Sequence, residues 1–212
     1  MIITWLGQAC FKIQGKETTI VIDPYENIGL KLPRLSANLL CITHSHHDHA
    51  YRKGVSGDPY IIDGPGEYEV KKVFVYGVAG YHDTKQGAER GVVTMYRIDF
   101  EDLTLAHLGD LGTSELTPEQ LEKLEDVDIL MLPIGGVYTI DAQGASKIIS
   151  QIEPRIVIPM HYQIPGLKLP KKIDTSDKFR KEMGSKAEEM DKFRVTKRDI
   201  PQEETKIIFL KP

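Results

Sequence analysis

The chain of 212 residues is long enough for one domain with a sizeable hydrophobic core, or for two small domains. Hydrophobic residues make up 41% and charged residues 27%, and the net charge of −4 at pH 7 argues against nucleic acid or an anionic membrane as a partner, because both favour a basic surface. Two cysteines suggest no disulfide framework, the N-terminal stretch lacks the pattern of a signal peptide, and no apolar run approaches the ~18 residues that span a bilayer. We therefore predict a cytoplasmic protein, with residues 1–212 forming a single domain because no clean linker divides them.

The first half of the chain is rich in predicted β-strands. Short apolar or alternating runs lie at residues 2–7, 9–14, 18–23, 38–43, 59–63, 68–70, 72–80, 92–100 and 103–109. Residues 18–23 are apolar on both faces toward their end, which is typical of a central strand. Lys71-Lys72 and Glu101-Asp102 are the predicted turns between later strands.

Helices appear in the second half. Thr117 is the predicted N-cap of a helix, with Pro118 at the first helical position and Gln120 completing a capping box. A β-α-β unit follows, which predicts parallel pairing of its two strands. Its strand, helix and second strand lie at residues 127–134, 141–152 and 155–160.

The last part of the chain, residues 165–204, is highly charged and rich in lysine. Residues 176–195 are predicted to form one surface helix or two, weakened at Gly184, and residues 205–210 form the closing strand. The charged segment is also a candidate cap for the mouth of a functional site.

The most informative stretch is CITHSHHDHA, which follows a predicted strand and holds four of the chain's seven histidines. Imidazoles cannot crowd together as neutral core residues, because each buried ring nitrogen needs a hydrogen-bond partner. A divalent cation solves this problem, since imidazole and carboxylate are its ligands. His44 and His46 can face one ion, while Asp48 and His49 point into a second volume beside it. His47 is predicted to face solvent or to support a ligand; a solvent-exposed cluster is the alternative for the whole loop.

Further ligands must come from elsewhere, and few candidates remain. His82, Asp110 and His161 each lie just past the carboxyl end of a predicted strand, where open sheets place their ligands. Lone histidines are usually structural, so the residues alone leave these three as candidates. His107 lies within its strand and is predicted to have a core or supporting role.

These motifs together resemble the metallo-β-lactamase superfamily over nearly the whole chain. The sequence His44-x-His46-x-Asp48-His49 matches its HxHxDH motif, and His82, Asp110 and His161 fit its remaining ligand positions. Residues 5–13, 21–25, 106–112 and 132–162 resemble its other conserved segments, the last most closely in the UlaG-like or NAPE-phospholipase-like branch of Zn-dependent hydrolases. Gln8 departs from the pattern, because many relatives of this branch have a histidine there.

The resemblance implies a fold and a ligand set. The fold is an α/β, four-layer αβ/βα sandwich, with the site at a strand edge between two sheets. His44, His46 and His82 would hold one ion, Asp48, His49 and His161 would hold the second, and Asp110 would bridge them. Asp23, at the end of a strand, is predicted to orient a ligand histidine; a turn cap before Pro24 is the alternative.

We therefore predict a metal-dependent hydrolase that uses a metal-bridging hydroxide on a small ester, lactone or phosphodiester. Asp110 is the catalytic bridge, and Asp48 is a candidate for moving a proton. The cofactor is predicted to be two divalent ions, zinc first, with manganese, iron or nickel as alternatives. An RNA-processing nuclease and a non-catalytic metal-binding module are the competing functions; oxygen chemistry at a di-iron site would need an electron carrier. Whether the chain forms a homo-oligomer is left open.

Several weaker candidates surround the metal motifs. Four basic side chains could bind a phosphate, although exposure to solvent at the surface is the simpler interpretation. They are Arg52, Lys53, Lys85 and Arg90. Tyr138 and Tyr162 are candidates for contacting a substrate. Asp63, Glu67 and Glu69 are predicted to lie in a turn that leads into a strand.

Overall fold

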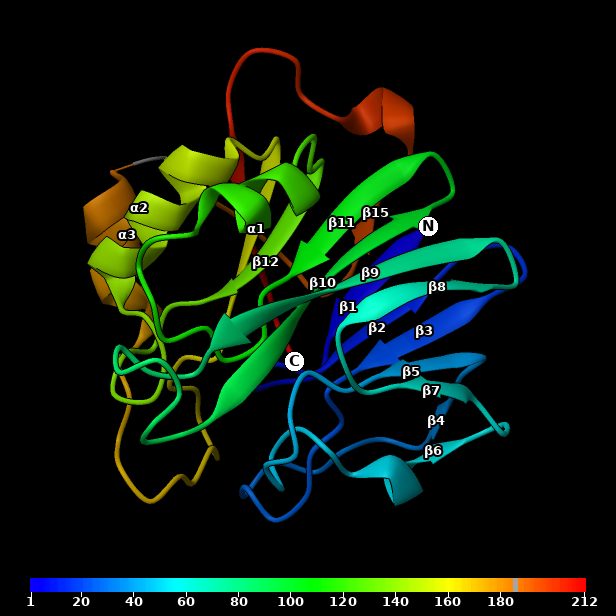
Figure 1. The fold of residues 1–212 in the computed structure, drawn as a ribbon, viewed down its shortest axis with the longest axis horizontal. Helices are drawn as coiled ribbons and strands as arrows, with labels where there is room; N and C mark the ends of the chain where they lie inside the picture. The colour runs from blue at the N-terminus through cyan, green and yellow to red at the C-terminus, as the bar shows by residue number, and fades with distance from the viewer. Residues whose placement is uncertain (185–186) are drawn as a thin grey trace.

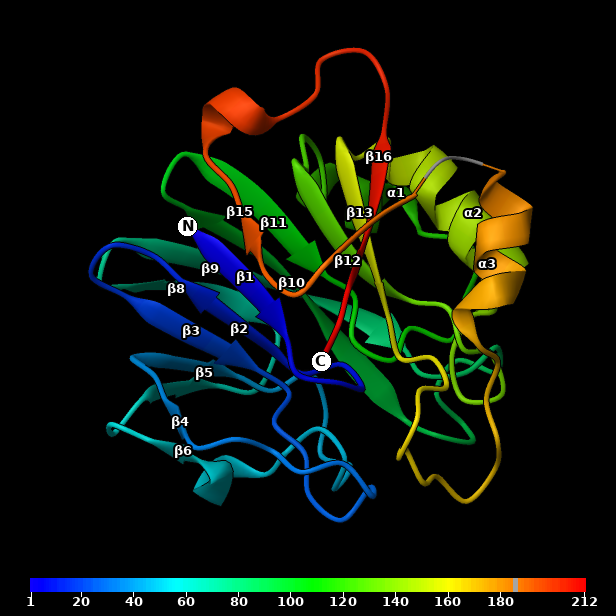
Figure 2. The same ribbon diagram turned by 180° about the vertical axis from the view of Figure 1, so that it is seen from behind.

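Two β-sheets lie at the centre of the computed structural model, which describes residues 1–184 and 187–212 (Figures 1 and 2). The smaller sheet has six strands in the order β15-β1-β2-β3-β5-β7. Its strands are β1 (Ile2–Trp5), β2 (Phe11–Gln14), β3 (Thr19–Ile22), β5 (Leu39–Cys41), β7 (Tyr60–Ile62) and β15 (Phe193–Arg194). A separate pair, β4 (Leu35–Ser36) and β6 (Val55–Ser56), lies beside it.

The larger sheet has eight strands in the order β14-β16-β13-β12-β11-β10-β9-β8. They are β8 (Gly66–Val70), β9 (Val73–Tyr81), β10 (Val92–Phe100), β11 (Leu103–His107), β12 (Ile129–Pro133), β13 (Ile156–Met160), β14 (Ala187–Met190) and β16 (Lys206–Leu210). Strands β11, β12, β13 and β16 are parallel, and β9 runs in the same direction because it is separated from β11 by the antiparallel β10. The carboxyl ends of these strands therefore share one edge of the sheet.

Both predicted hairpin turns are confirmed. Lys71 and Lys72 join β8 to β9 with φ of 51° and 63°, and Glu101 and Asp102 join β10 to β11 with φ of 50° and 63°. Two successive residues with positive φ make a type I′ turn, whose twist matches that of the flanking strands.

The predicted β-α-β unit is confirmed as well. Strand β12 pairs in parallel with β13, and helix α2 (Ala142–Ile152) connects them. The buried face of α2 is small and apolar and consists of Ala142, Gly144, Ala145, Ile148, Ile149 and Ile152. Helix α1 (Pro118–Lys123) begins at the predicted N-cap, Thr117, with its capping box.

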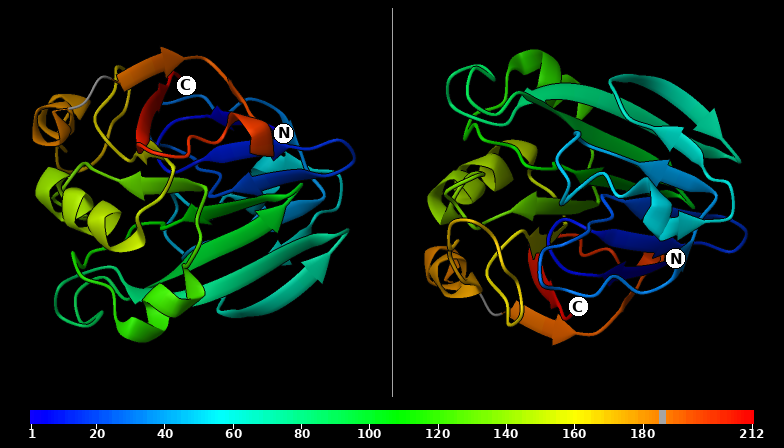
Figure 3. Two further views of the ribbon diagram at one scale, coloured as in Figure 1. Left: turned by 90° about the horizontal axis from the view of Figure 1, so that it is seen from above. Right: turned by 90° about the horizontal axis from the view of Figure 1, so that it is seen from below.

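Among the described residues, α-helices cover only one side of the two packed sheets. Helices α1, α2 and α3 (Ser176–Met183) lie together against the outer face of the larger sheet (Figure 3). The outer face of the smaller sheet is covered by irregular chain, β4, β6 and the 3-10 helix η1 (Arg52–Gly54), through contacts that include Tyr25, Ile28 and Leu35. Pro24, Gly29 and Pro33 disfavour an α-helix in this covering segment. The predicted fourth layer is thus present but is not α-helical.

The helical prediction for residues 176–195 is wrong beyond Gly184. Helix α3 ends there, with Gly184 in the left-handed conformation at φ of 58°. Ser185 and Lys186, inside the predicted segment, lie outside the described residues. After them, β14 pairs with β16, and β15 pairs with β1, before a second 3-10 helix, η2 (Lys197–Asp199). Pairing with strands distant in the sequence overrides the local helix propensity here.

Among the described residues, none of the helices combines the length and apolarity that a membrane crossing requires. Cys10 and Cys41 are both buried free thiols.

Candidate metal centre

The candidate ligands gather at one edge of the two sheets because each follows the carboxyl end of a strand. His44 follows β5 in the smaller sheet, while His82, Asp110 and His161 follow β9, β11 and β13 in the larger one. Parallel strands deliver the residues after them to a common edge, so segments far apart in the sequence meet there. All seven predicted ligands are brought together: His44, His46, Asp48, His49, His82, Asp110 and His161.

Asp110 lies at the centre of this cluster. Its Oδ2 atom lies 3.2 Å from His49 Nε2, 3.1 Å from His161 Nε2 and 3.4 Å from His82 Nε2. His44 and His82 have ring centroids 4.9 Å apart, and His44 and His46 are 4.6 Å apart. A single carboxylate therefore faces histidines of both predicted half-sites.

Two groups of three side chains can each present donor atoms within 4.8 Å of one another: His44, His46 and His82, and separately Asp48, His49 and His161. These are the two predicted half-sites. A third such combination is Asp23, His44 and His49, but the Asp23 carboxylate is already engaged by protein donors. His47 is exposed, as predicted, with Nδ1 3.9 Å from Asp48 Oδ1.

The unpaired atoms of this cluster fit divalent cations. Five of its buried side-chain atoms have no hydrogen-bond partner: His44 Nε2, His49 Nε2, His82 Nδ1, His161 Nδ1 and Asp110 Oδ1. Buried polar atoms are almost always paired in folded proteins. Five unpaired atoms in one place therefore need an explanation. Cations bound among imidazoles and carboxylates would satisfy His44 Nε2, His49 Nε2 and Asp110 Oδ1. The Nδ1 atoms of His82 and His161 lie on the other side of rings whose Nε2 atoms face Asp110.

Asp23 supports the cluster in the way predicted for an orienting partner. Its Oδ2 lies 3.0 Å from His49 Nδ1 and accepts from Thr43 Oγ1 at 2.6 Å, while its Oδ1 accepts from the Thr43 backbone N–H at 2.8 Å. Thr43 Oγ1 also lies 3.0 Å from His44 Nδ1. With the Nδ1 atoms of His44 and His49 engaged in this way, their Nε2 atoms are free to face the cluster.

Burial and neighbouring charges set the protonation states. Burial, together with the nearby His49, lowers the pKa of His44 to about 3, and burial lowers that of His82. Burial alone would raise the pKa of Asp110, but His161 and His49 hold it well below its usual range. Burial also opposes charge on His49, yet Asp110, Asp23 and Asp48 raise its pKa well above the usual value. A cation bound among these carboxylates would replace that proton.

The cluster forms the floor of a pocket of 280 Å³. Its walls come from the segment 84–91, the loop after β12 and the segment after His161, and the lining residues include Glu89, Arg90, Tyr138, Leu169 and Pro170. Arg90 lies over the Tyr138 ring, with its guanidinium carbon 5.5 Å from the ring centroid. Part of the charged segment after residue 165 therefore reaches this site, through Leu169 and Pro170.

The other weaker candidates lie elsewhere. Arg52 pairs with Asp63, and Lys85 pairs with Glu89 at 2.6 Å. Tyr162 packs in the core against Trp5, with ring centroids 5.0 Å apart. His107 is buried and its Nε2 lies 2.9 Å from the carbonyl oxygen of Ala9, in keeping with its predicted core role.

Sequence reasoning missed the role of Asp83, the residue after His82. Its carboxylate accepts four backbone N–H groups, from Lys85, Gly87, Glu89 and Arg90 at 2.7 to 3.0 Å. These bonds outweigh the effect of desolvation and lower the pKa of Asp83 to about 2. They fold the segment 84–91 into a loop that holds Arg90 at the pocket, and Asp followed by glycine four residues later was the only local sign of it.

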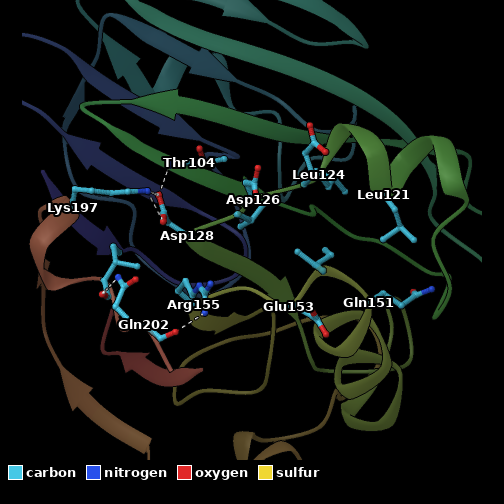
Figure 4. A pocket seen from close by; sticks show the side chains of 14 residues that line it. Thr104, Leu121, Leu124, Asp126, Asp128, Gln151, Glu153, Arg155, Lys197 and Gln202 are labelled. Atoms are coloured by element: carbon cyan, nitrogen blue, oxygen red, sulfur yellow. Dashed lines mark hydrogen bonds and ion pairs between the residues drawn. The ribbon is translucent and has the colours of Figure 1, made fainter. Parts of the chain in front are cut away.

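A larger cleft, of 660 Å³, lies at the opposite ends of the strands (Figure 4). Its buried carboxylate is paired: Asp128 accepts from Lys197 Nζ at 2.8 and 2.9 Å and from the Thr104 backbone N–H at 3.0 Å. Arg155 donates to the Gln202 carbonyl at 2.9 Å. None of the seven candidate ligands lines this cleft.

Comparison with known proteins gives consistent results. The family model described as a β-lactamase superfamily domain matches residues 2–161. A UPF0173 metal-dependent hydrolase of Staphylothermus marinus is 31% identical in an alignment that covers 76% of this chain and 83% of the relative. A protein of the same name from Thermococcus onnurineus is 29% identical in an alignment that covers 88% of this chain and 93% of the relative.

The fold matches as well. The crystal structure of a candidate Zn-dependent hydrolase of the metallo-β-lactamase superfamily from Thermotoga maritima superposes with a TM-score of 0.81 and 30% identity, covering 99% of this chain and 97% of the other. The predicted metallo-β-lactamase fold is thereby confirmed. By its sequence and its architecture, the chain belongs to the β-lactamase superfamily.

Proposed function

We propose that this protein is a metal-dependent hydrolase that acts on a small ester, lactone or phosphodiester. One observation carries the proposal: the Asp110 carboxylate lies within 3.4 Å of histidines from two separate groups of potential ligands. The names of the Staphylothermus and Thermococcus relatives support hydrolysis and a metal requirement.

Each side chain of the cluster has a proposed task. Divalent cations held by these side chains would lower the pKa of a bound water toward ~7 and would stabilise negative charge that develops on the substrate. Asp110 faces both groups and would bridge them. Asp23 holds His49 in the orientation that directs its Nε2 atom inward. Asp48 lines the pocket and is proposed to receive or return a proton during turnover.

The pocket favours a small substrate over RNA. Its volume of 280 Å³ is at the lower end of the range for small-molecule sites, ~300–1,000 Å³. Apart from histidines, Arg90 is the one basic side chain among the described residues that line it. Nucleic acid would need a basic groove that neutralises many phosphates. The single Arg90 instead suits one anionic group, such as that of a phosphodiester.

Zinc is the proposed cofactor because imidazole and carboxylate donors suit it, with manganese, iron and nickel as alternatives. The resemblance of residues 132–162 to the UlaG-like branch supports a lactone or phosphodiester substrate. A non-catalytic metal-binding module is the competing proposal.

The test is a panel of substrates offered to protein loaded with Zn²⁺ or Mn²⁺: p-nitrophenyl esters and phosphodiesters, lactones, thioesters and β-lactams. Turnover of one class that disappears in chelated protein and in Asp110→Asn would support the hydrolase. A loaded protein inert toward every member would favour the non-catalytic module. Weakening of RNA binding between two salt concentrations, accompanied by RNA cleavage, would favour the nuclease.

A further inference from the structure

Gln8 lies between two of the candidate ligands, although it belongs to neither predicted half-site. Its side chain is fully buried, and its Nε2 atom lies 2.9 Å from Asp48 Oδ2 and 2.8 Å from His161 Nε2. Its Oε1 atom is buried without a hydrogen-bond partner. The terminal amide of Gln8 therefore contacts Asp48 and His161, which belong to the same half-site as His49. Its oxygen atom has no hydrogen-bond partner.

The backbone fixes Gln8 in this place. Its carbonyl oxygen accepts from the indole N–H of Trp5 at 2.9 Å and from the backbone N–H of His161 at 3.0 Å. Its φ is 52°, a left-handed conformation that follows Gly7 at φ of 97°. A non-glycine residue in this region is uncommon, so the tight turn aims the side chain inward at some cost in backbone energy.

The two ends of the amide suit two different states of the site. With Nε2 inward, the amide donates to Asp48, but Oε1 is left buried without a partner. The two ends have nearly the same shape, so rotation about the last side-chain bond exchanges them. With Oε1 inward, an oxygen would lie beside the Asp48 carboxylate, which is repulsive unless a cation lies between them. An amide oxygen is a suitable ligand for a divalent cation.

We propose that Gln8 is a further metal ligand: its Oε1 atom binds the cation held by Asp48, His49 and His161, and the amide turns its nitrogen toward Asp48 when that cation is absent. This inference rests on the two metal ions of the proposed function. A neutral amide oxygen binds zinc less well than imidazole does. The ion at this half-site is therefore held more weakly than it would be with a further histidine in place of Gln8.

The experiment is a titration of metal-free protein with Zn²⁺ in competition with a chromogenic chelator, which measures each equivalent without turnover. Gln8→Leu removes both ends of the amide, whereas Gln8→Glu keeps an oxygen and removes the N–H. Gln14→Leu, the same exchange in strand β2 away from the cluster, is the matched control. Circular dichroism of each metal-free variant verifies the fold.

We expect Gln8→Leu to weaken the second equivalent about tenfold or more, with the first equivalent and the Gln14→Leu control unchanged. Gln8→Glu should bind the second equivalent at least as tightly as the wild type. If Gln8 served only to donate to Asp48, neither variant would take away a ligand, and Gln8→Leu would bind both equivalents about as tightly as the wild type does. Should Gln8→Leu fail to fold, a Gln8→Glu variant that binds the second equivalent more weakly than the wild type contradicts the ligand role, because a carboxylate oxygen at this position should hold a cation at least as well as an amide oxygen.

The possible outcomes distinguish a failure of the Gln8 ligand from a failure of the proposed hydrolase function. Wild-type protein that binds two equivalents, with unchanged affinity in Gln8→Leu, contradicts the role of Gln8 alone. Wild-type protein that binds only one equivalent of Zn²⁺, or none, contradicts the two-metal site and with it both proposals. Two equivalents with the predicted losses, but no hydrolysis of any substrate, support the ligand and contradict the enzyme.

Discussion

The two ends of the central strands hold cavities of opposite character. The cleft at the amino ends is the larger, at 660 Å³ against 280 Å³, but its buried carboxylate, Asp128, is fully paired. In the part of the chain that the structure describes, every buried side-chain nitrogen or oxygen without a partner lies in the cluster at the carboxyl ends: Gln8, His44, His49, His82, Asp110 and His161. Unsatisfied polar atoms, not cavity size, therefore distinguish a prepared binding site from a surface hollow.

The largest effect is expected from His46→Ala. This exposed side chain belongs to the group with His44 and His82, so its loss should remove at least one equivalent of bound metal and abolish hydrolysis without unfolding the protein. Elemental analysis and an activity assay measure both. His47→Ala, one position along and also exposed, is the control for metal content and should retain its metal; unchanged metal content in His46→Ala would refute its assignment as a ligand.

Asp110→Asn should lower kcat by about 100-fold or more, because it removes the charge shared by the two groups. The shape of the side chain is kept, but the metal-free variant loses the charge that faces His49 and His161, so its melting temperature should fall while circular dichroism shows the same fold. A fully active Asp110→Asn enzyme would rule out the bridging role.

Asp23→Asn tests the support beneath the ligands. Loss of the carboxylate that holds His49 and Thr43 should weaken cation affinity about 10- to 100-fold. Asp99→Asn, which disturbs an ion pair with Arg97 away from the site, serves as the control. Unchanged affinity in Asp23→Asn would leave this residue as no more than a turn before Pro24.

Arg90→Gln should change selectivity more than overall activity. The ratio of kcat/KM for bis(p-nitrophenyl) phosphate to that for neutral p-nitrophenyl acetate should fall about tenfold, because the positive charge that would contact the anionic substrate is lost from the pocket. Arg52→Gln removes a cation that pairs with Asp63 and does not line the pocket, so it should leave the ratio unchanged. An unaltered ratio in Arg90→Gln would exclude Arg90 from substrate binding.

The smallest functional effect belongs to the amino-end cleft. Asp128→Asn should cost about 1–3 kcal/mol of stability, because it disrupts charge-assisted hydrogen bonds from Lys197, yet metal content and kcat/KM should not change. Chemical denaturation and the hydrolysis assay measure the two quantities. A loss of activity at equal metal content would show that this end of the molecule also takes part in function.

Local features of the fold were predictable because short-range rules decide them. The turns at Lys71-Lys72 and Glu101-Asp102 and the cap at Thr117 depend on a few neighbouring residues. The strand at Ala187–Met190 was not predictable in this way, since its composition suits a surface helix and only its pairing with β16 makes it a strand.

The residues of the candidate site also differ in whether local sequence or long-range packing reveals them. The spacing of His44, His46, Asp48 and His49 is a local signal, and the positions of His82, Asp110 and His161 at strand ends became specific once the family resemblance was added. Gln8 stood out in the sequence only as a departure from the family pattern, because its contacts with Asp48 and His161 span 40 and 153 positions of the chain. Only the packed structure shows that its amide enters the cluster.

The most direct test of the central claim is anomalous scattering from crystals of zinc-loaded protein. We expect two peaks beside Asp110, one contacted by His44, His46 and His82 and the other by Asp48, His49 and His161. A density map with no peak among these side chains, at full zinc loading, would contradict the proposed metal centre.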